Sequence, residues 1–99
     1  MKLNNESFEK EILNGKGIAM VDFYADWCGP CRMQAPIVEA IAEENPDVVV
    51  AKLNVDDVDD VAERFNIVSI PTLLIFKGGK LVKNFVGVTM KANILAALK

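Results

Sequence analysis

The sequence contains two cysteines, Cys28 and Cys31, with Gly29 and Pro30 between them. Two intervening residues let both sulfur atoms meet across one helical turn, so the pair can close a disulfide with little movement of the backbone. The chain has no histidine, which excludes Cys-His and Ser-His-Asp catalysis. A structural zinc site needs four ligands, and two thiols fall short unless carboxylates or a second chain supply the rest. We therefore expect no metal site, and the dithiol is the candidate for chemistry.

Reactivity of this pair requires that one thiol ionise, because the thiolate is the nucleophile and a free thiol has a pKa of about 8.5. A helix N-terminus stabilises a negative charge by about 0.3–1 kcal/mol, and by up to ~2 kcal/mol in favourable geometries. Cys28 lies nearer the expected helix start than Cys31, so we predict Cys28 as the attacking thiol and Cys31 as the resolving thiol. Gly29 allows another chain to approach closely, and Pro30 in the first helical turn loses no intrahelical hydrogen bond. The alternative is a static disulfide or two inert thiols.

Apolar periodicity and turn residues predict the elements that position the pair. Two expected helices cover residues 7–13 and 32–44. A third is expected after a cap at Asp56 or Asp57, and a fourth after a cap at Thr89. The expected strands cover residues 18–25, 48–53, 72–76 and 81–86, the last two joined across a glycine pair at 78–79. The apolar stripe of the second helix is expected to contain Met33, Ile37, Ala40 and Ile41.

The order of these elements predicts an α/β fold with a mixed central β-sheet flanked by helices on both faces. Residues 18–25 are apolar on both faces except for Asp22, which is typical of a buried central strand. The dithiol then lies just past the carboxyl end of that strand, where α/β sheets present their sites. A length of 99 residues accommodates one domain, expected over residues 1–99.

Four segments of the sequence carry a family resemblance, over roughly residue 6 onward. Residues 21–31, VDFYADWCGPC, resemble the active-site segment of the thioredoxin family almost residue for residue. Residues 51–56, residues 69–76 and residues 86–87 look like three further thioredoxin segments in the right order and spacing. The resemblance implies the thioredoxin fold and protein disulfide reduction for redox homeostasis. Gly29 and Pro30 between the cysteines favour thioredoxins over glutaredoxins and disulfide-isomerase domains.

Asp22 is the next candidate for a functional role. An acid in an otherwise apolar buried strand is costly to ionise, so burial should raise its pKa. The resemblance implies that Asp22 lies beneath the cysteine pair and helps to move a proton to or from Cys31. It also implies that Lys52 is a buried lysine near this acid. The alternative is a structural Asp-Lys pair without a kinetic role.

The resemblance further implies a substrate-docking surface beside the dithiol. Pro71 matches a family proline that faces the active site after a cis peptide bond. The backbone of Ile70 would pair with an extended substrate segment, as in strand addition. Trp27, Ile70, Gly87 and Val88 would line an apolar groove, in which Val88 replaces a smaller family residue and affects partner choice. The alternative for Trp27 is partial packing in the core.

Charge and composition limit the partners. The net charge of −3 argues against nucleic acid. Residues 1–66 carry all fourteen acidic residues, whereas residues 67–99 carry five lysines and no acid. No apolar run approaches the ~18 residues that span a membrane, and the N-terminus has no signal-peptide core, so we expect a cytoplasmic protein that does not enter a membrane.

The expected partners are disulfide-containing proteins and a thioredoxin reductase, which the resemblance implies. We expect a monomer. We also expect no bound cofactor, because the two thiols of Cys28 and Cys31 hold both electrons and release them when the Cys28–Cys31 disulfide forms. Two alternatives stay open. The chain could be a binding module whose thiols act as a redox-sensitive switch, or an enzyme that works as an oxidant.

Overall fold

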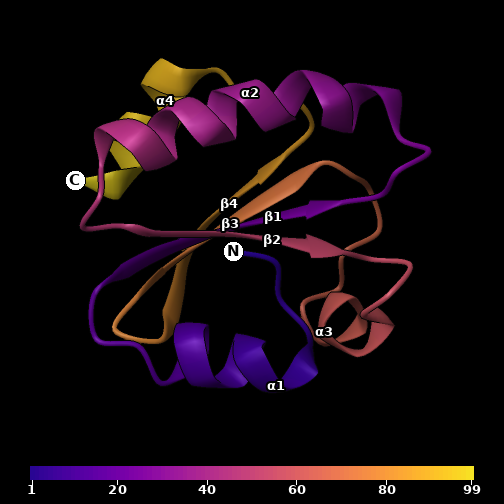
Figure 1. Ribbon diagram of the computed structural model, residues 1–99, viewed down its shortest axis with the longest axis horizontal. Coiled ribbons are helices and arrows are strands. Elements are labelled where there is room, and N and C mark those ends of the chain that lie inside the picture. The colour runs from indigo at the N-terminus through magenta and orange to yellow at the C-terminus, as the bar shows by residue number, and fades with distance from the viewer.

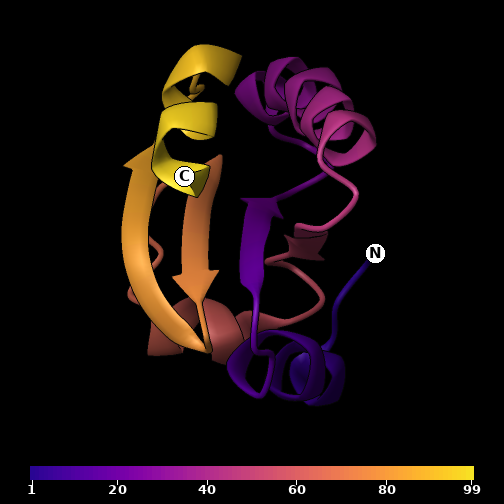
Figure 2. The ribbon, with the colours of Figure 1, turned by 90° about the vertical axis from the view of Figure 1, so that its left-hand side faces the viewer.

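A computed structural model describes residues 1–99 as a four-stranded sheet between two layers of helices (Figure 1). The strands are β1 (Ile18–Tyr24), β2 (Val49–Asn54), β3 (Thr72–Lys77) and β4 (Lys80–Val86). The helices are α1 (Asn5–Phe8), which continues as the π-helical segment η1 (Glu9–Leu13), α2 (Gly29–Glu44), α3 (Asp59–Arg64) and α4 (Lys91–Leu98). Helices α2 and α4 cover one face, and α1 and α3 cover the other (Figures 1 and 2). This arrangement confirms the predicted α/β class and the mixed sheet.

Strand β1 lies inside the sheet, in which the strand order is β2-β1-β3-β4. It pairs in parallel with β2 and antiparallel with β3, and β3 pairs antiparallel with β4. The N-terminal segment adds a short bridge along β2, where the Leu3 N–H donates to the Lys52 carbonyl oxygen at 2.9 Å. Because β1 is flanked by strands on both sides, the connection that follows it leaves the sheet near its centre and leads directly to the dithiol.

The side chains of β1 alternate between two apolar cores, as the period of two in a strand requires. Val21 and Phe23 belong to the core beneath α1 and α3, in which Phe8, Phe65 and Phe76 pack edge to face. Met20 belongs to the opposite core, beneath α2 and α4. Asp22 shares this parity with Met20, so its carboxyl group points to the α2 side of the sheet. The acid is therefore on the same side of β1 as the helix that carries the cysteines.

The buried face of α2 differs from the predicted stripe. Met33 is 65% exposed, and the fully or nearly buried residues are Cys31, Gln34, Val38 and Ile41. The prediction assigned only apolar residues to the buried face, so the predicted face is rotated by about one residue from the observed one. The polar Gln34 is tolerated inside because its side-chain amide hydrogen-bonds to the backbone of Thr89. The helix also begins at Gly29 rather than at residue 32, with Pro30 in its first turn and Pro36 inside it.

The predicted caps of the last two helices are wrong. Helix α3 follows Val58 and α4 follows Met90, and neither residue makes a side-chain capping hydrogen bond. The candidate caps have other partners. Asp56 accepts a hydrogen bond from the Trp27 indole, Asp57 lies 3.7 Å from the Lys2 ammonium, and the Thr89 hydroxyl donates to the Gly87 carbonyl oxygen. Tertiary contacts of Asp56 and Asp57, and a local contact of Thr89, thus replace the capping that the sequence pattern favours.

The hairpin between β3 and β4 turns at Gly78 and Gly79, as predicted. Their φ angles are 58° and 81°, and two successive positive φ values match a two-residue hairpin turn of type I′. A Cβ atom on Gly79 would lie 2.1 Å from the Leu13 carbonyl oxygen, whereas a Cβ on Gly78 would come no closer than 4.0 Å to its nearest neighbour. The hairpin tip therefore packs directly against the end of η1, and this contact depends on Gly79.

We predict that Gly79→Ala destabilises the fold more than its matched control, Gly78→Ala. Both substitutions place alanine in a left-handed conformation, at a cost of about 1–2 kcal/mol. Gly79→Ala also forces the hairpin away from Leu13, and overpacking adds about 1–3 kcal/mol. Urea unfolding of both variants measures the difference. Equal free energies of unfolding for the two variants would contradict the close approach to η1.

Candidate active site around the dithiol

Cys28 and Cys31 form a disulfide at the start of α2, with their Cα atoms 5.3 Å apart. Cys28 is the N-cap residue of the helix, and its sulfur accepts a hydrogen bond from the Cys31 N–H at 3.2 Å. Both side chains are buried. One backbone N–H and the positive end of the helix dipole therefore face the Cys28 sulfur, and both stabilise a negative charge there. This geometry favours Cys28 over Cys31 as the thiol that ionises first.

Two loop segments meet beside the cysteines. The Ile70–Pro71 peptide bond is cis, as the family resemblance implied, and the Cys28 sulfur lies 3.8 Å from the Ile70 carbonyl oxygen. The Gly87 N–H donates to the Pro71 carbonyl oxygen at 2.8 Å, and Gly87 has a φ of 89°. The structure thus brings together three segments, which are the start of α2, the loop before β3 and the loop after β4. Side chains or backbone of another protein can contact all three at once.

Trp27 lies outside the core, because its side chain is 69% exposed. Its indole Nε1–H donates to a carboxylate oxygen of Asp56 at 2.8 Å, which fixes the orientation of the ring. Ile70 is half-buried against the cysteines, and Val88 is partly exposed. The side chains of Trp27, Ile70 and Val88, all expected to line a docking surface, are therefore at least partly exposed to solvent. The core-packing alternative for Trp27 is excluded by its exposure.

Asp22 is buried under the dithiol helix, with 4% of the residue exposed. Its Oδ1 atom accepts no hydrogen bond from the protein. Loss of hydration raises the pKa of this carboxyl from 3.8 to about 6, and the positive charge of Lys52 opposes the shift in part. The carboxyl therefore exchanges its proton close to neutral pH, unlike an ordinary surface aspartate.

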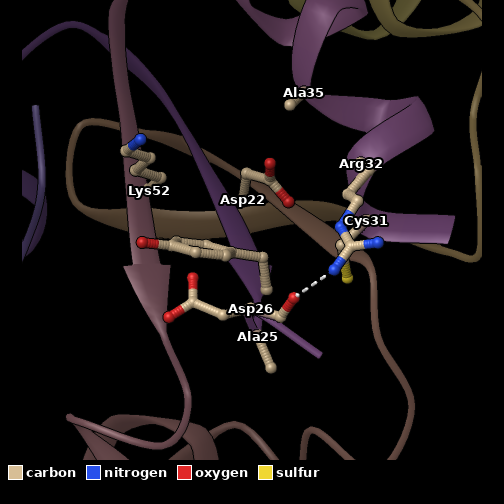
Figure 3. Close-up of a pocket in the computed structure, with 8 residues that line it drawn as sticks. Asp22, Ala25, Asp26, Cys31, Arg32, Ala35 and Lys52 are labelled. Carbon is tan, nitrogen blue, oxygen red and sulfur yellow. Dashed lines mark hydrogen bonds between the residues drawn. The ribbon is translucent and has the colours of Figure 1, made fainter. Parts of the chain in front are cut away.

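Asp22 and Cys31 line one cavity, with a volume of about 210 Å³. Figure 3 shows its wall, to which β1 contributes Asp22 and α2 contributes Arg32. The Arg32 guanidinium donates to the Asp26 carbonyl oxygen at 3.1 Å, marked by the dashed line in Figure 3. The cavity is wide enough to hold water beside the Asp22 carboxyl and Cys31.

Lys52 lines the same cavity, but it is exposed rather than buried, which corrects the expectation from the resemblance. Its ammonium lies 5.6 Å from the centre of the Tyr24 ring and makes no ion pair with Asp22 within 4.0 Å. The long aliphatic stem of lysine lets the charge reach solvent from a strand near the sheet edge. Lys52 therefore acts on Asp22 through its field, not through a direct contact.

Sequence reasoning missed two polar residues near the site, Gln34 and Asn54. Gln34 is fully buried on the dithiol helix, and Asn54 hydrogen-bonds to the Asp26 carboxylate at 3.5 Å and to the Asp56 N–H at 3.0 Å. A polar residue at a position where the helix period requires an apolar one was the available signal for Gln34. Asn54 carries no comparable signal, because an asparagine at the end of a strand is common in turns.

The structure also bears on metal binding and on membrane crossing. No three His, Cys, Asp or Glu side chains lie close enough together to hold a metal ion. None of the helices combines the length and the apolar character that a membrane crossing requires.

Comparisons with known proteins agree on one family. The family model described as thioredoxin matches residues 1–99. A protein of Alicyclobacillus acidocaldarius named thioredoxin is 48% identical over 99 residues, which are 99% of this chain and 93% of that one. A thioredoxin of Mycobacterium bovis is 46% identical, over 99% of this chain and 85% of its own. A Mycobacterium leprae protein named bifunctional thioredoxin reductase/thioredoxin is 43% identical, over 99% of this chain and 22% of its own.

We predict that Asp22→Asn stabilises the protein at neutral pH and not in acid. The folded-state pKa of about 6 lies above the unfolded value of 3.8, so the folded state binds the proton more tightly. Ionisation of Asp22 therefore lowers the free energy of unfolding as pH rises from about 4 to 6, and the full cost above pH 6 is about 3 kcal/mol. Urea unfolding across this range measures the gap between the two chains. A gap that does not change with pH would contradict the buried carboxyl.

Proposed function

The chain belongs to the thioredoxin family, and we propose that it reduces disulfide bonds in other proteins with Cys28 as the attacking thiolate. Thioredoxins are protein disulfide oxidoreductases, and this chain has their dithiol at the start of α2. The observation that carries the proposal is the hydrogen bond from the Cys31 N–H to the Cys28 sulfur, at the positive end of the helix dipole. A static disulfide would not need a sulfur that is held as a helix cap.

The reaction has two exchange steps in which atoms and electrons balance. In the first step, the Cys28 thiolate attacks one sulfur of the substrate disulfide. The substrate S–S bond breaks, a mixed disulfide forms, and the departing substrate thiolate takes up a proton. In the second step, Cys31 loses its proton and attacks the Cys28 sulfur. The mixed disulfide breaks, the Cys28–Cys31 disulfide forms, and the second substrate sulfur leaves as a thiolate that takes up a proton. The substrate disulfide has then gained two electrons in total, one for each sulfur.

Asp22 is the proposed base for Cys31 in the second step. The two residues line one cavity, and the carboxyl pKa of about 6 leaves it ionised at neutral pH yet able to accept a proton. Lys52, at the same cavity, favours the ionised form of Asp22 through its positive charge. Burial of Asp22 lowers stability, but it also makes the carboxylate a stronger base, since a fully solvated carboxylate has a lower pKa.

The proposed docking surface consists of Trp27, Ile70, Pro71, Gly87 and Val88, next to Gly29 and Pro30. Its support is the accessibility of Trp27 and Val88 and the proximity of the Ile70 backbone to the Cys28 sulfur. An extended substrate segment would place its disulfide over Cys28 while its backbone pairs with Ile70. A Cβ atom placed on Gly29 would meet no other atom within 4 Å, so the approach to the sulfur from that side is open.

A thioredoxin reductase is the proposed electron donor that restores the dithiol after each cycle. The relative whose name joins thioredoxin reductase and thioredoxin supports this partner. We further propose that the protein works as a monomer in the cytoplasm. One chain supplies both thiols and the whole docking surface, and a reducing compartment keeps such a pair available as thiols.

We expect the unmodified protein to accelerate the reduction of insulin disulfides by dithiothreitol, and Cys28→Ser to abolish the acceleration. The serine hydroxyl does not ionise at neutral pH and cannot form the mixed disulfide. Turbidity from precipitating insulin chains gives the rate, and dithiothreitol without protein gives the background. If neither chain exceeds that background, the disulfide-reductase proposal fails for this substrate and a redox-sensitive binding module becomes the better interpretation.

We expect Cys31→Ser to trap the mixed disulfide with a substrate. In Asp22→Asn, which keeps Cys31, we expect the mixed disulfide to live about tenfold longer at neutral pH, an effect below the ~10²–10⁴-fold typical of general acid–base catalysis. Non-reducing electrophoresis measures the trapped species, and rapid acid quenching measures its decay. The first step, followed separately, should change little in Asp22→Asn. An unchanged lifetime in that variant would assign Asp22 a purely structural role.

A further inference from the structure

Gln34 has no part in the function derived so far, yet it is fully buried on the dithiol helix, 0% exposed. It follows Cys31 by three residues, so the two side chains lie on the same face of α2. Both polar atoms of its amide bind the backbone of a single residue. Gln34 Nε2 donates to the Thr89 carbonyl oxygen at 3.1 Å, and the Thr89 N–H donates to Gln34 Oε1 at 2.7 Å. A side chain on α2 therefore holds the loop that joins β4 to α4.

This loop contains part of the docking surface. The Thr89 hydroxyl donates to the Gly87 carbonyl oxygen at 3.1 Å, and the Gly87 N–H donates to the Pro71 carbonyl oxygen at 2.8 Å. Val88 thus lies between two residues whose backbones are both anchored. A continuous set of hydrogen bonds runs from α2 through Thr89 and Gly87 to Pro71, and it connects the three segments that surround the dithiol.

The amide of Gln34 matches what Thr89 requires. Thr89 is itself buried, so its N–H and C=O need partners inside the protein. A side-chain amide has an acceptor oxygen and an NH2 group with two donors, so it can bind the C=O and the N–H of one residue at the same time. An apolar residue at this position would leave both backbone groups unpaired, or the loop would shift outward until water reached them. The side chain therefore determines where the loop lies relative to α2.

We propose that Gln34 is a positioning residue that fixes the Gly87–Val88 part of the docking surface against the dithiol helix and so sets the affinity for protein substrates. The inference rests on the proposed function and deepens it. Gln34 touches neither sulfur, and it acts through Thr89. Its loss should weaken substrate docking while the reactivity of the Cys28 thiolate stays the same, because the helix start and the Cys31 N–H are unchanged.

The test compares Gln34→Met with the unmodified protein. Methionine has a similar length and cannot replace the paired hydrogen bonds. The reduced protein is mixed with increasing insulin, and the fluorescence of Trp27, the only tryptophan, follows the reaction. We expect the half-saturating insulin concentration to rise by about tenfold, the equivalent of one or two lost hydrogen bonds. The maximal rate and the rate of Cys28 alkylation by iodoacetamide should stay within about twofold.

Val38→Ala is the matched control, because Val38 is buried on the same helix and its side chain makes no hydrogen bond to Thr89. It lowers stability through lost core packing and should leave the half-saturating concentration unchanged. An equal rise in both variants, or a fall in alkylation rate that matches the loss in Gln34→Met, would overturn the proposal. No insulin reaction in the unmodified protein would instead refute the proposed function itself.

Amide hydrogen exchange of the unmodified protein supplies a measurement that does not depend on the variant folding. We expect the Thr89 N–H to exchange slowly, in contrast to the exposed Val68 and Ser69, whose N–H groups make no hydrogen bond within the protein. Exchange at Thr89 as fast as at Val68 and Ser69 would overturn the proposal, because the loop would then open without resistance from Gln34.

Discussion

The unpaired backbone N–H groups at the start of α2 are the constraint on which the active site depends. Every helix begins with such groups, and in this protein a sulfur atom, not an oxygen, accepts one of them. The same bond that starts the helix therefore also stabilises the negative sulfur that thiol–disulfide exchange needs. The sheet places this helix start at the end of its buried strand β1, and the loops at Ile70–Pro71 and Gly87 lie beside it.

Burial of the Asp22 carboxyl lowers the stability of the fold when the carboxyl is ionised. A central strand with apolar contacts on both faces is the least favourable place in the sheet for a carboxylate, and its raised pKa measures that cost. The chain tolerates the cost because most of the other residues of β1 and β3 are apolar and buried. The charge of Lys52 opposes the rise in the Asp22 pKa in part, and no ion pair joins the two residues. The proposed role of Asp22 as a base therefore comes at a cost to stability.

Much of the fold could be predicted from local pattern, because β1 and β3 are nearly continuous apolar runs and glycine marks the hairpin at 78–79. The dithiol and Asp22 also stand out, since both break the pattern around them. The prediction failed where tertiary contacts override local preference. Asp56 binds Trp27 and does not cap a helix, Met33 lies outside because Gln34 has polar partners inside, and the exposed Lys52 ammonium depends on how far a flexible side chain reaches. None of these contacts has a signature within a few residues of sequence.

Two buried polar side chains, Asp22 on β1 and Gln34 on α2, lie on the same side of the sheet, and they differ in how their hydrogen bonds are met. Gln34 has a partner for its amide oxygen and for one of its two N–H donors, and these two bonds hold a loop in one position. Asp22 has an oxygen without any partner from the protein, so the hydration that its carboxylate has lost governs how tightly it holds a proton. The Gln34 amide does not titrate, so its hydrogen bonds only hold it in place. The Asp22 carboxyl does titrate, and its burial moves the pKa toward neutral pH. The two proposed roles therefore follow from different chemistry: a paired amide positions the docking loop, and a desolvated carboxyl exchanges a proton beneath the dithiol.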